Sequence, residues 1–76
     1  MDNLTDLEKV VLQVIIDFDE GIESVTEDIL YVLKKEHNIN SKSARGVFSS
    51  LVKKNLIKMD IINEDRSTIL YIGGDN

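Results

Sequence analysis

The feature that most constrains the fold is a change of hydrophobic period near residue 55. Before it, apolar residues recur with the spacing of one helix face, at Ala44, Val47, Phe48, Leu51 and Val52. After it the period is two, as in a strand, with apolar side chains at Ile57, Met59 and Ile61. We therefore expect a helix over about 41–54 that runs directly into a strand.

Two more helices are expected before this segment. A helix over about 5–18 begins with a T-x-x-E capping box, Thr5 and Glu8, which satisfies free N–H groups at a helix start. A helix over about 25–36 follows a second such pair, Ser24 and Glu27. The short apolar connector at residues 22–25 could also pair as a small extra strand.

The sequence pattern of residues 57–72 predicts one β-hairpin. Residues 57–72 are two β-prone segments around a polar turn, Asn63 to Arg66. The helix over about 41–54 has a signal at each end. Asn40 or Ser41 is a suitable N-cap, and Asn55 can adopt the left-handed conformation that ends a helix. The expected fold class is α+β, mainly α, as one domain over residues 1–76.

The first helix has two apolar faces. One stripe has helical spacing and comprises Leu4, Leu7, Val11, Val14, Ile15 and Phe18. Leu12 and Ile16 lie outside that stripe and need a partner of their own. Either the sheet or the third helix covers them, or they form the contact of a homodimer.

Composition excludes several classes of site. The chain has no cysteine and one histidine, so disulfides, thiolate metal sites and a histidine metal cluster are not expected. The lone His37 is interpreted as a surface residue, and Ile39 beside it as a buried anchor. No nucleophile stands with a base, so we expect neither an enzyme nor a cofactor. No apolar run could span a bilayer, and the acidic N-terminus is unlike a signal peptide, so a cytoplasmic protein is expected.

Charge is unevenly distributed along this acidic chain, whose net charge is −5. Residues 1–33 carry nine acids and one lysine, residues 34–58 carry seven cations and one acid, and residues 59–76 carry four acids and one arginine. Such segregation indicates one cationic face on an acidic body, although a lysine-rich helix can also simply be solvated.

The outer face of the third helix is cationic and contains no acid. Lys42, Gly46, Ser49 and Lys53 lie opposite its apolar stripe, flanked by Arg45 and Ser50. Small residues let a helix backbone approach another surface closely, as insertion into the DNA major groove requires. A glycine inside a helix costs about 1 kcal/mol relative to alanine, and such an approach would justify it.

The segment SKSARGVFSSLVKKNLIKM resembles the recognition helix and strand entry of winged helix-turn-helix DNA-binding domains, in particular small MarR-like regulators. In it, small and polar residues open the helix, a leucine anchors its middle, and Asn55 takes a position often held by glycine. The resemblance covers about residues 5–72. It implies three helices with a C-terminal two-stranded hairpin, the wing.

The resemblance also implies a site on double-stranded DNA. The third helix would enter the major groove, and the wing would touch the backbone or minor groove. Its implied contacts are Lys42, Ser43, Arg45, Gly46, Ser49 and Lys53 on the helix, with Asn63 and Arg66 on the wing. Arg45 would read guanine, while lysines and serines would hold phosphates. A dimer is expected because one short helix reads few bases, with Leu12 and Ile16 as its candidate contacts.

A second function class stays open. The chain is acidic as a whole, and Glu64 and Asp65 at the expected wing tip would repel phosphates. Winged helices also serve as protein–protein interaction modules, and an acidic first helix and wing would suit a basic partner. In that case the cationic face of the third helix is only solvated.

Overall fold

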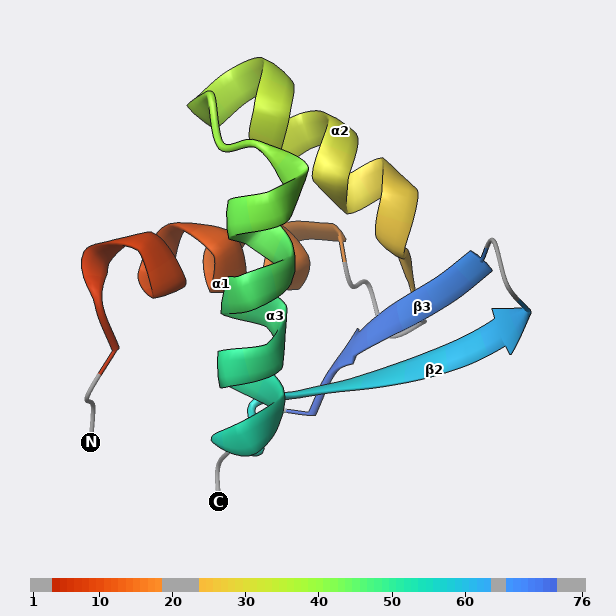
Figure 1. Ribbon diagram of the computed structural model, residues 1–76. Coiled ribbons are helices and arrows are strands. Elements are labelled where there is room, and N and C mark those ends of the chain that lie inside the picture. Colours follow the sequence, from red (N-terminus) through yellow and green to blue (C-terminus); the bar gives the residue numbers. More distant parts are fainter. Residues whose placement is uncertain (1–3, 19–23, 64–65, 73–76) are drawn as a thin grey trace.

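The computed structural model describes residues 4–18, 24–63 and 66–72. Three helices and three strands follow one another along this part of the chain: α1 (Asp6–Phe18), β1 (Ser24–Val25), α2 (Thr26–His37), α3 (Ser41–Lys53), β2 (Ile57–Asn63) and β3 (Arg66–Tyr71). In Figure 1, α3 crosses in front of α1, and the sheet lies beside both. The predicted helices are present, each with ends within one residue of the expected positions.

The sheet has three antiparallel strands in the order β1-β3-β2. The expectation of a two-stranded sheet is thus corrected, because Ser24 and Val25 pair with Ile69 and Thr68 of β3. This is the small extra strand that the connector allowed.

The second predicted capping box, Ser24 and Glu27, is wrong because Ser24 belongs to the added strand β1. Ser24 is buried in β1, and α2 begins after Val25, whose side chain makes no capping hydrogen bond.

The other caps agree with the sequence. In α1 the Thr5 N–H donates to Glu8 Oε1 at 2.9 Å, and the Glu8 N–H donates to Thr5 Oγ1 at 3.1 Å. In α3 the N-cap is Asn40, whose Oδ1 accepts from the Ser43 N–H at 2.8 Å. Asn55 has a φ of 62°, so it turns the chain from α3 into β2.

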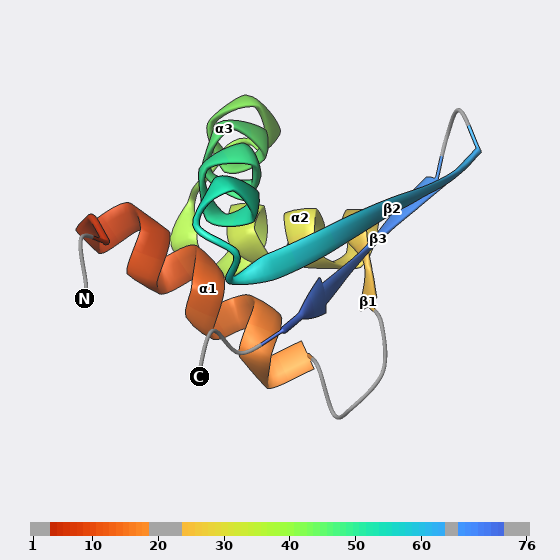
Figure 2. The same ribbon diagram turned by 90° about the horizontal axis from the view of Figure 1, so that it is seen from below.

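The core lies between the helices and one face of the sheet (Figure 2). Its buried apolar residues are Val11, Val14, Ile15, Ile29, Leu33, Ala44, Val47, Phe48, Leu51, Ile57 and Ile69. Ile39 packs against this cluster as a partly buried residue, and His37 is exposed. Two assignments to the core are wrong, because Leu7 is 40% exposed and Val52 is 38% exposed.

The second apolar face of α1 is covered in part by its own chain. α1 packs against α2, α3 and β3, and Leu12 is among the partly buried residues that contact the core. Ile16 is half-buried. A homodimer contact through these two residues stays a prediction, with less apolar surface to offer than the sequence indicated.

Within the part of the chain that the structure describes, no helix is long and apolar enough to cross a membrane.

Candidate nucleic-acid interface

The six α3 residues named as DNA contacts are exposed to solvent. They are Lys42, Ser43, Arg45, Gly46, Ser49 and Lys53. The opposite side of α3 is buried, so the helix presents one cationic face outward. Ser50, which the sequence placed beside that face, instead turns toward α1, where its hydroxyl donates to Glu8 Oε2.

Crowding among the described residues does not explain the glycine at position 46. A Cβ atom added there would have no heavy atom of the described chain within 4 Å, apart from its sequence neighbours and the backbone of its own helix. Gly46 therefore relieves no internal crowding, although it lowers the helix propensity of α3. The space outside this turn of α3 is open to a ligand.

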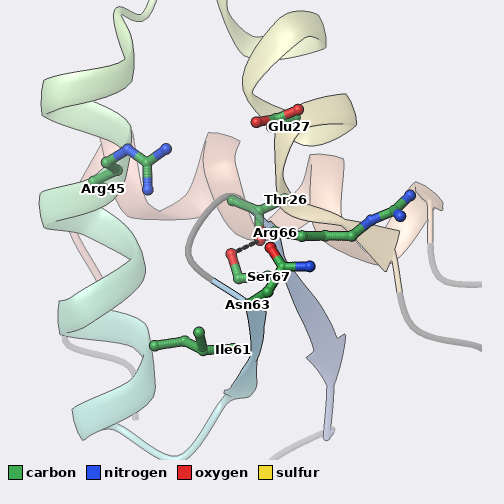
Figure 3. Close-up of a pocket in the computed structure, with 7 residues that line it drawn as sticks. All are labelled: Thr26, Glu27, Arg45, Ile61, Asn63, Arg66 and Ser67. Atoms are coloured by element: carbon green, nitrogen blue, oxygen red, sulfur yellow. Dashed lines mark hydrogen bonds between the residues drawn. The ribbon is translucent and has the colours of Figure 1, made fainter.

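Arg45 shares a groove with both residues that were named on the hairpin. The groove has a volume of about 180 Å³ and is lined by Thr26, Glu27, Arg45, Ile61, Asn63, Arg66 and Ser67. Figure 3 shows Arg45 reaching from α3 toward the space above the strands, while the Arg66 side chain extends away from it on the far side. Residues about twenty positions apart in the sequence thus line one concave surface.

The floor of the groove is fixed by a link between the sheet and α2. Ser67 Oγ donates to Thr26 Oγ1 at 2.7 Å, and Thr26 is buried (Figure 3). This bond joins β3 to the first residue of α2. It holds the start of α2 against the strand end that carries Arg66, so the groove wall is anchored on regular elements.

Four lining residues were not anticipated as part of a site: Thr26, Glu27, Ile61 and Ser67. Glu27 adds a carboxylate to a groove that also holds two arginines, and Glu27 and Asp28 line a neighbouring hollow with Asn63 and Arg66. Ile61 is 81% exposed and places an apolar side chain beside the polar ones. The hydrophobic alternation of β2 pointed Ile61 toward the core, but the strand extends beyond the helices at that position.

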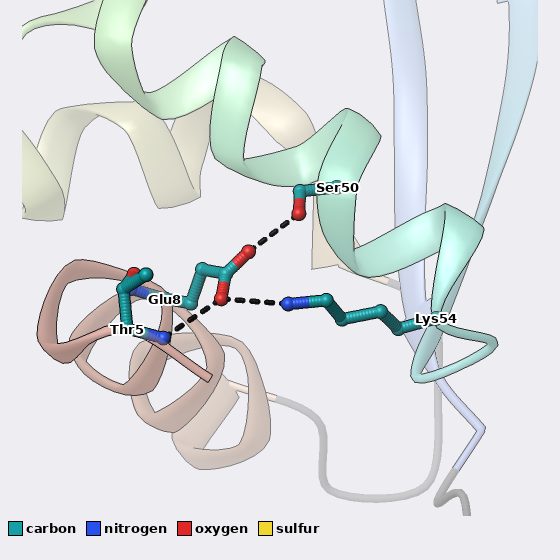
Figure 4. A network of polar contacts seen from close by, with 4 residues as sticks. All are labelled: Thr5, Glu8, Ser50 and Lys54. Carbon is teal, nitrogen blue, oxygen red and sulfur yellow. Dashed lines mark hydrogen bonds and ion pairs between the residues drawn. The ribbon is translucent and has the colours of Figure 1, made fainter. Parts of the chain in front are cut away.

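One cation of the basic segment has a structural partner. Lys54 Nζ lies 2.9 Å from Glu8 Oε1, and Glu8 is only 6% exposed (Figure 4). Hydrogen bonds from the Ser50 hydroxyl, the Lys54 ammonium and the Thr5 N–H lower the pKa of Glu8 from 4.5 to about 2, against the opposing effect of burial. The sequence identified Glu8 as a cap but did not indicate its partners, Ser50 on α3 and Lys54 directly after it.

Lys35 also has a local contact, since its Nζ lies 5.6 Å from the centre of the Tyr31 ring on α2. The remaining named cations of α3 and the hairpin stand at the exposed face and the groove. Among the described residues, no group of three or more histidines and carboxylates could hold a metal ion.

Comparisons of this chain with protein-family models, with curated proteins and with solved structures found no match in any of the three.

Proposed function

We propose that this chain is a small winged-helix DNA-binding protein that acts as a transcriptional regulator. In this proposal α3 enters the major groove and the β2–β3 pair is the wing. One observation carries it. Arg45 on the exposed face of α3 lines the same groove as Asn63 and Arg66 of the strands, so the two predicted contact surfaces are continuous.

The exposed face of α3 has the chemistry that a major groove requires. It carries Lys42, Arg45 and Lys53 without an acid, and Gly46 leaves its middle without a side chain. A guanidinium can donate two hydrogen bonds to guanine, so Arg45 is the proposed base-reading residue. The lysines and serines would bind phosphates and fix the register of the helix on the duplex.

The acidic body of the protein sets the expected strength of binding. A single module with a few phosphate contacts and a net charge of −5 should bind weakly and lose affinity steeply with salt. The Glu27 carboxylate in the groove should repel a DNA phosphate that approaches Arg45 or Arg66. Useful specificity would then come from two copies on successive major grooves.

The direct test is a titration of isotope-labelled protein with a mixed-sequence DNA duplex at low and physiological salt, followed by backbone amide NMR. The proposal expects shifts confined to residues 41–54 and to the strands around the groove, weakening as salt rises. An absence of shifts at low salt would contradict DNA binding.

Variants assign the contacts once a duplex that contains a cognate site has been selected. Arg45→Ala should weaken binding to a cognate site by about 1–3 kcal/mol while the fold stays intact. Lys9→Ala on α1 removes the same charge from an exposed position elsewhere, and it should have little effect. Glu27→Gln should strengthen binding, because it removes a carboxylate from the groove. Equal effects of Arg45→Ala and Lys9→Ala would contradict the role of Arg45.

A protein–protein interaction module is the second candidate. The observation that favours it is the pair of neighbouring isoleucines Ile61 and Ile62, which are 81% and 58% exposed; Ile61 lines the groove together with Glu27 of α2. In this case the titration gives no DNA-dependent shifts, and Ile61→Ser, rather than Arg45→Ala, abolishes binding to the partner.

A further inference from the structure

The outer face of the sheet, which points away from the helices, has no covering layer among the described residues. The core takes Ile57 and Ile69 from the other face. Side chains alternate between the two faces along a strand, and directly paired residues share a face. The outer face therefore includes the residues in between, namely Val25, Lys58, Asp60, Thr68, Leu70 and Ile72.

This face is more apolar than a solvated face usually is. Antiparallel sheets that face water on one side carry mainly polar side chains there. Here Val25 and Leu70 are half-buried without being among the partly buried residues that contact the core. Ile72, which continues the same face, is 47% exposed. Exposed apolar side chains that share one face can bind another protein surface.

Two charged side chains on the outer face are unpaired within the described structure. Lys58 is exposed and Asp60 is half-buried, and neither forms an ion pair with a described residue. They lie two positions apart on β2, so they stand side by side on this face. A surface that presents an acid opposite Lys58 and a cation opposite Asp60 would pair both. The same strand running in the opposite direction presents its charges in that order.

From these observations we infer that two copies of this chain pack their outer sheet faces together, with their β2 strands antiparallel. A two-fold axis midway between Lys58 and Asp60 places Lys58 of each copy opposite Asp60 of the other. The same axis passes midway between Leu70 and Thr68, because Leu70 pairs with Lys58 and Thr68 pairs with Asp60. It sets the larger Leu70 of one copy against the smaller Thr68 of the other, so that the two layers interdigitate.

The charges select this arrangement over the other two-fold packings of the same face. Packed sheets lie about 10 Å apart, a gap that facing lysine and aspartate side chains can bridge. An axis through the row of Lys58 or through the row of Asp60 would bring like charges together. An axis along β2 would do the same, and an axis along β3 would leave both charges unpaired.

The contact is small, so the dimer should be weak. Stable interfaces bury roughly 1,200–2,000 Å² in total, more than parts of three short strands can supply. We expect a dissociation constant on the order of 10 µM to 1 mM. The inference does not depend on the proposed DNA binding, because α3 packs on the opposite face of the sheet and stays accessible in such a dimer.

Charge reversal tests the arrangement with the intact chain. Sedimentation equilibrium up to about 1 mM protein should show a monomer–dimer equilibrium for the unchanged chain. Lys58→Asp alone and Asp60→Lys alone should each weaken self-association about tenfold, because both facing pairs become repulsive. The double variant Lys58→Asp/Asp60→Lys should restore it. An equimolar mixture of the two single variants should also associate, as a heterodimer.

A matched control and a local readout complete the test. Lys34→Asp changes an exposed cation on α2 by the same charge and should leave association unchanged. In a mixture of isotope-labelled and unlabelled chains, isotope-filtered NMR should show contacts between the Leu70 methyls of one copy and the Thr68 methyl of the other. Circular dichroism checks that each variant is folded. If the half-buried Asp60→Lys does not fold, the exposed Lys58→Asp and the methyl contacts decide the question.

Four results would overturn the inference. One is an unchanged chain that remains monomeric at about 1 mM. Another is a dimer that a folded single charge reversal does not weaken. The third is a dimer without methyl contacts between Leu70 and Thr68 of different copies, which would place the charges in some other contact. The fourth is a dimer that Ile16→Glu abolishes while Lys58→Asp leaves it intact, which would place the contact on α1. None of these outcomes bears on the DNA titration.

Discussion

α3 meets α1 through Glu8, Ser50 and Lys54, whereas on another side it faces the strands across the groove lined by Arg45, Asn63 and Arg66. At the first contact the carboxylate is nearly inaccessible and accepts three hydrogen bonds. At the second, the two arginines are exposed and share the space with one carboxylate. Polar residues of one helix thus hold the fold at one contact and remain accessible to a ligand at the other.

This difference separates stability from binding along α3. Changes on its buried side should alter the free energy of unfolding and leave any ligand affinity of the folded protein alone. Side-chain changes on its exposed side should do the reverse, except where they alter the helix propensity of α3 itself, as at Gly46. Four predictions, from the largest expected effect to the smallest, test whether that separation holds.

Phe48→Ala should destabilise the protein by about 3–5 kcal/mol, because Phe48 is 1% exposed in the core that both contacts rely on. Urea unfolding measures the change. Val52→Ala, four residues further along α3, is the matched control, and it should cost much less because Val52 is 38% exposed. Similar losses for the two variants would mean that the buried side of α3 is assigned wrongly.

Ser50→Ala should lower the free energy of unfolding by about 1.5–3 kcal/mol, since it removes a hydrogen bond to the Glu8 carboxylate. The neighbouring variant Ser49→Ala changes an exposed hydroxyl and should stay within about 0.5 kcal/mol. DNA affinity should respond in the opposite order. If the folded Ser50→Ala variant lost more DNA affinity than Ser49→Ala, the assignment of stability to one side of α3 and binding to the other would be contradicted.

Acid should weaken the α1–α3 contact through Glu8. The pKa of this group is lowered in the folded protein to about 2, from 4.5, so its contribution is fully present above about pH 4.5. That contribution is lost as the pH falls from about 4.5 to about 2. Glu8→Gln should therefore reduce the difference in unfolding free energy between pH 6 and pH 2.5. Parallel pH profiles for the variant and the unchanged chain would contradict this assignment.

Gly46→Ala gives the smallest expected change in stability and the sharpest comparison. It should stabilise α3 by about 1 kcal/mol, because alanine favours the helix and, among the described residues, a Cβ meets no atom of another element within 4 Å. If the α3 backbone approaches DNA closely at this turn, the same change should weaken DNA binding. Greater stability with unchanged affinity would show that Gly46 is not at a close contact.

Much of the local structure was predictable because its causes are local. The capping box of Thr5 and Glu8, the cap at Asn40 and the left-handed Asn55 each act within a few residues, and each is present. The period change near residue 55 placed α3 and β2 correctly. Where a local signal failed, a distant partner was responsible: Ser24 resembles a cap, but it pairs with Ile69 of β3.

The candidate site was predictable only as separate pieces. The outward face of α3 follows from its apolar stripe, so the exposure of Lys42, Arg45 and Lys53 could be inferred. That Glu27 and Ile61 line a groove with Arg45 could not, because it depends on where β2 and α2 come together. Ile61 is also exposed to solvent despite its place in the alternating pattern, because β2 extends beyond the helices at that position.

The sequence by itself determined the three helices, their ends and the segregation of charge, since periodicity and capping report which side of an element is apolar and where it stops. Only the tertiary structure decided the third strand, the placing of Arg45 and Arg66 along one groove, and the link from Glu8 to Ser50 and Lys54, which lie 42 and 46 residues away. The physical reason is that a local pattern shows that a face needs a partner, but the packing of the whole chain decides which partner it meets.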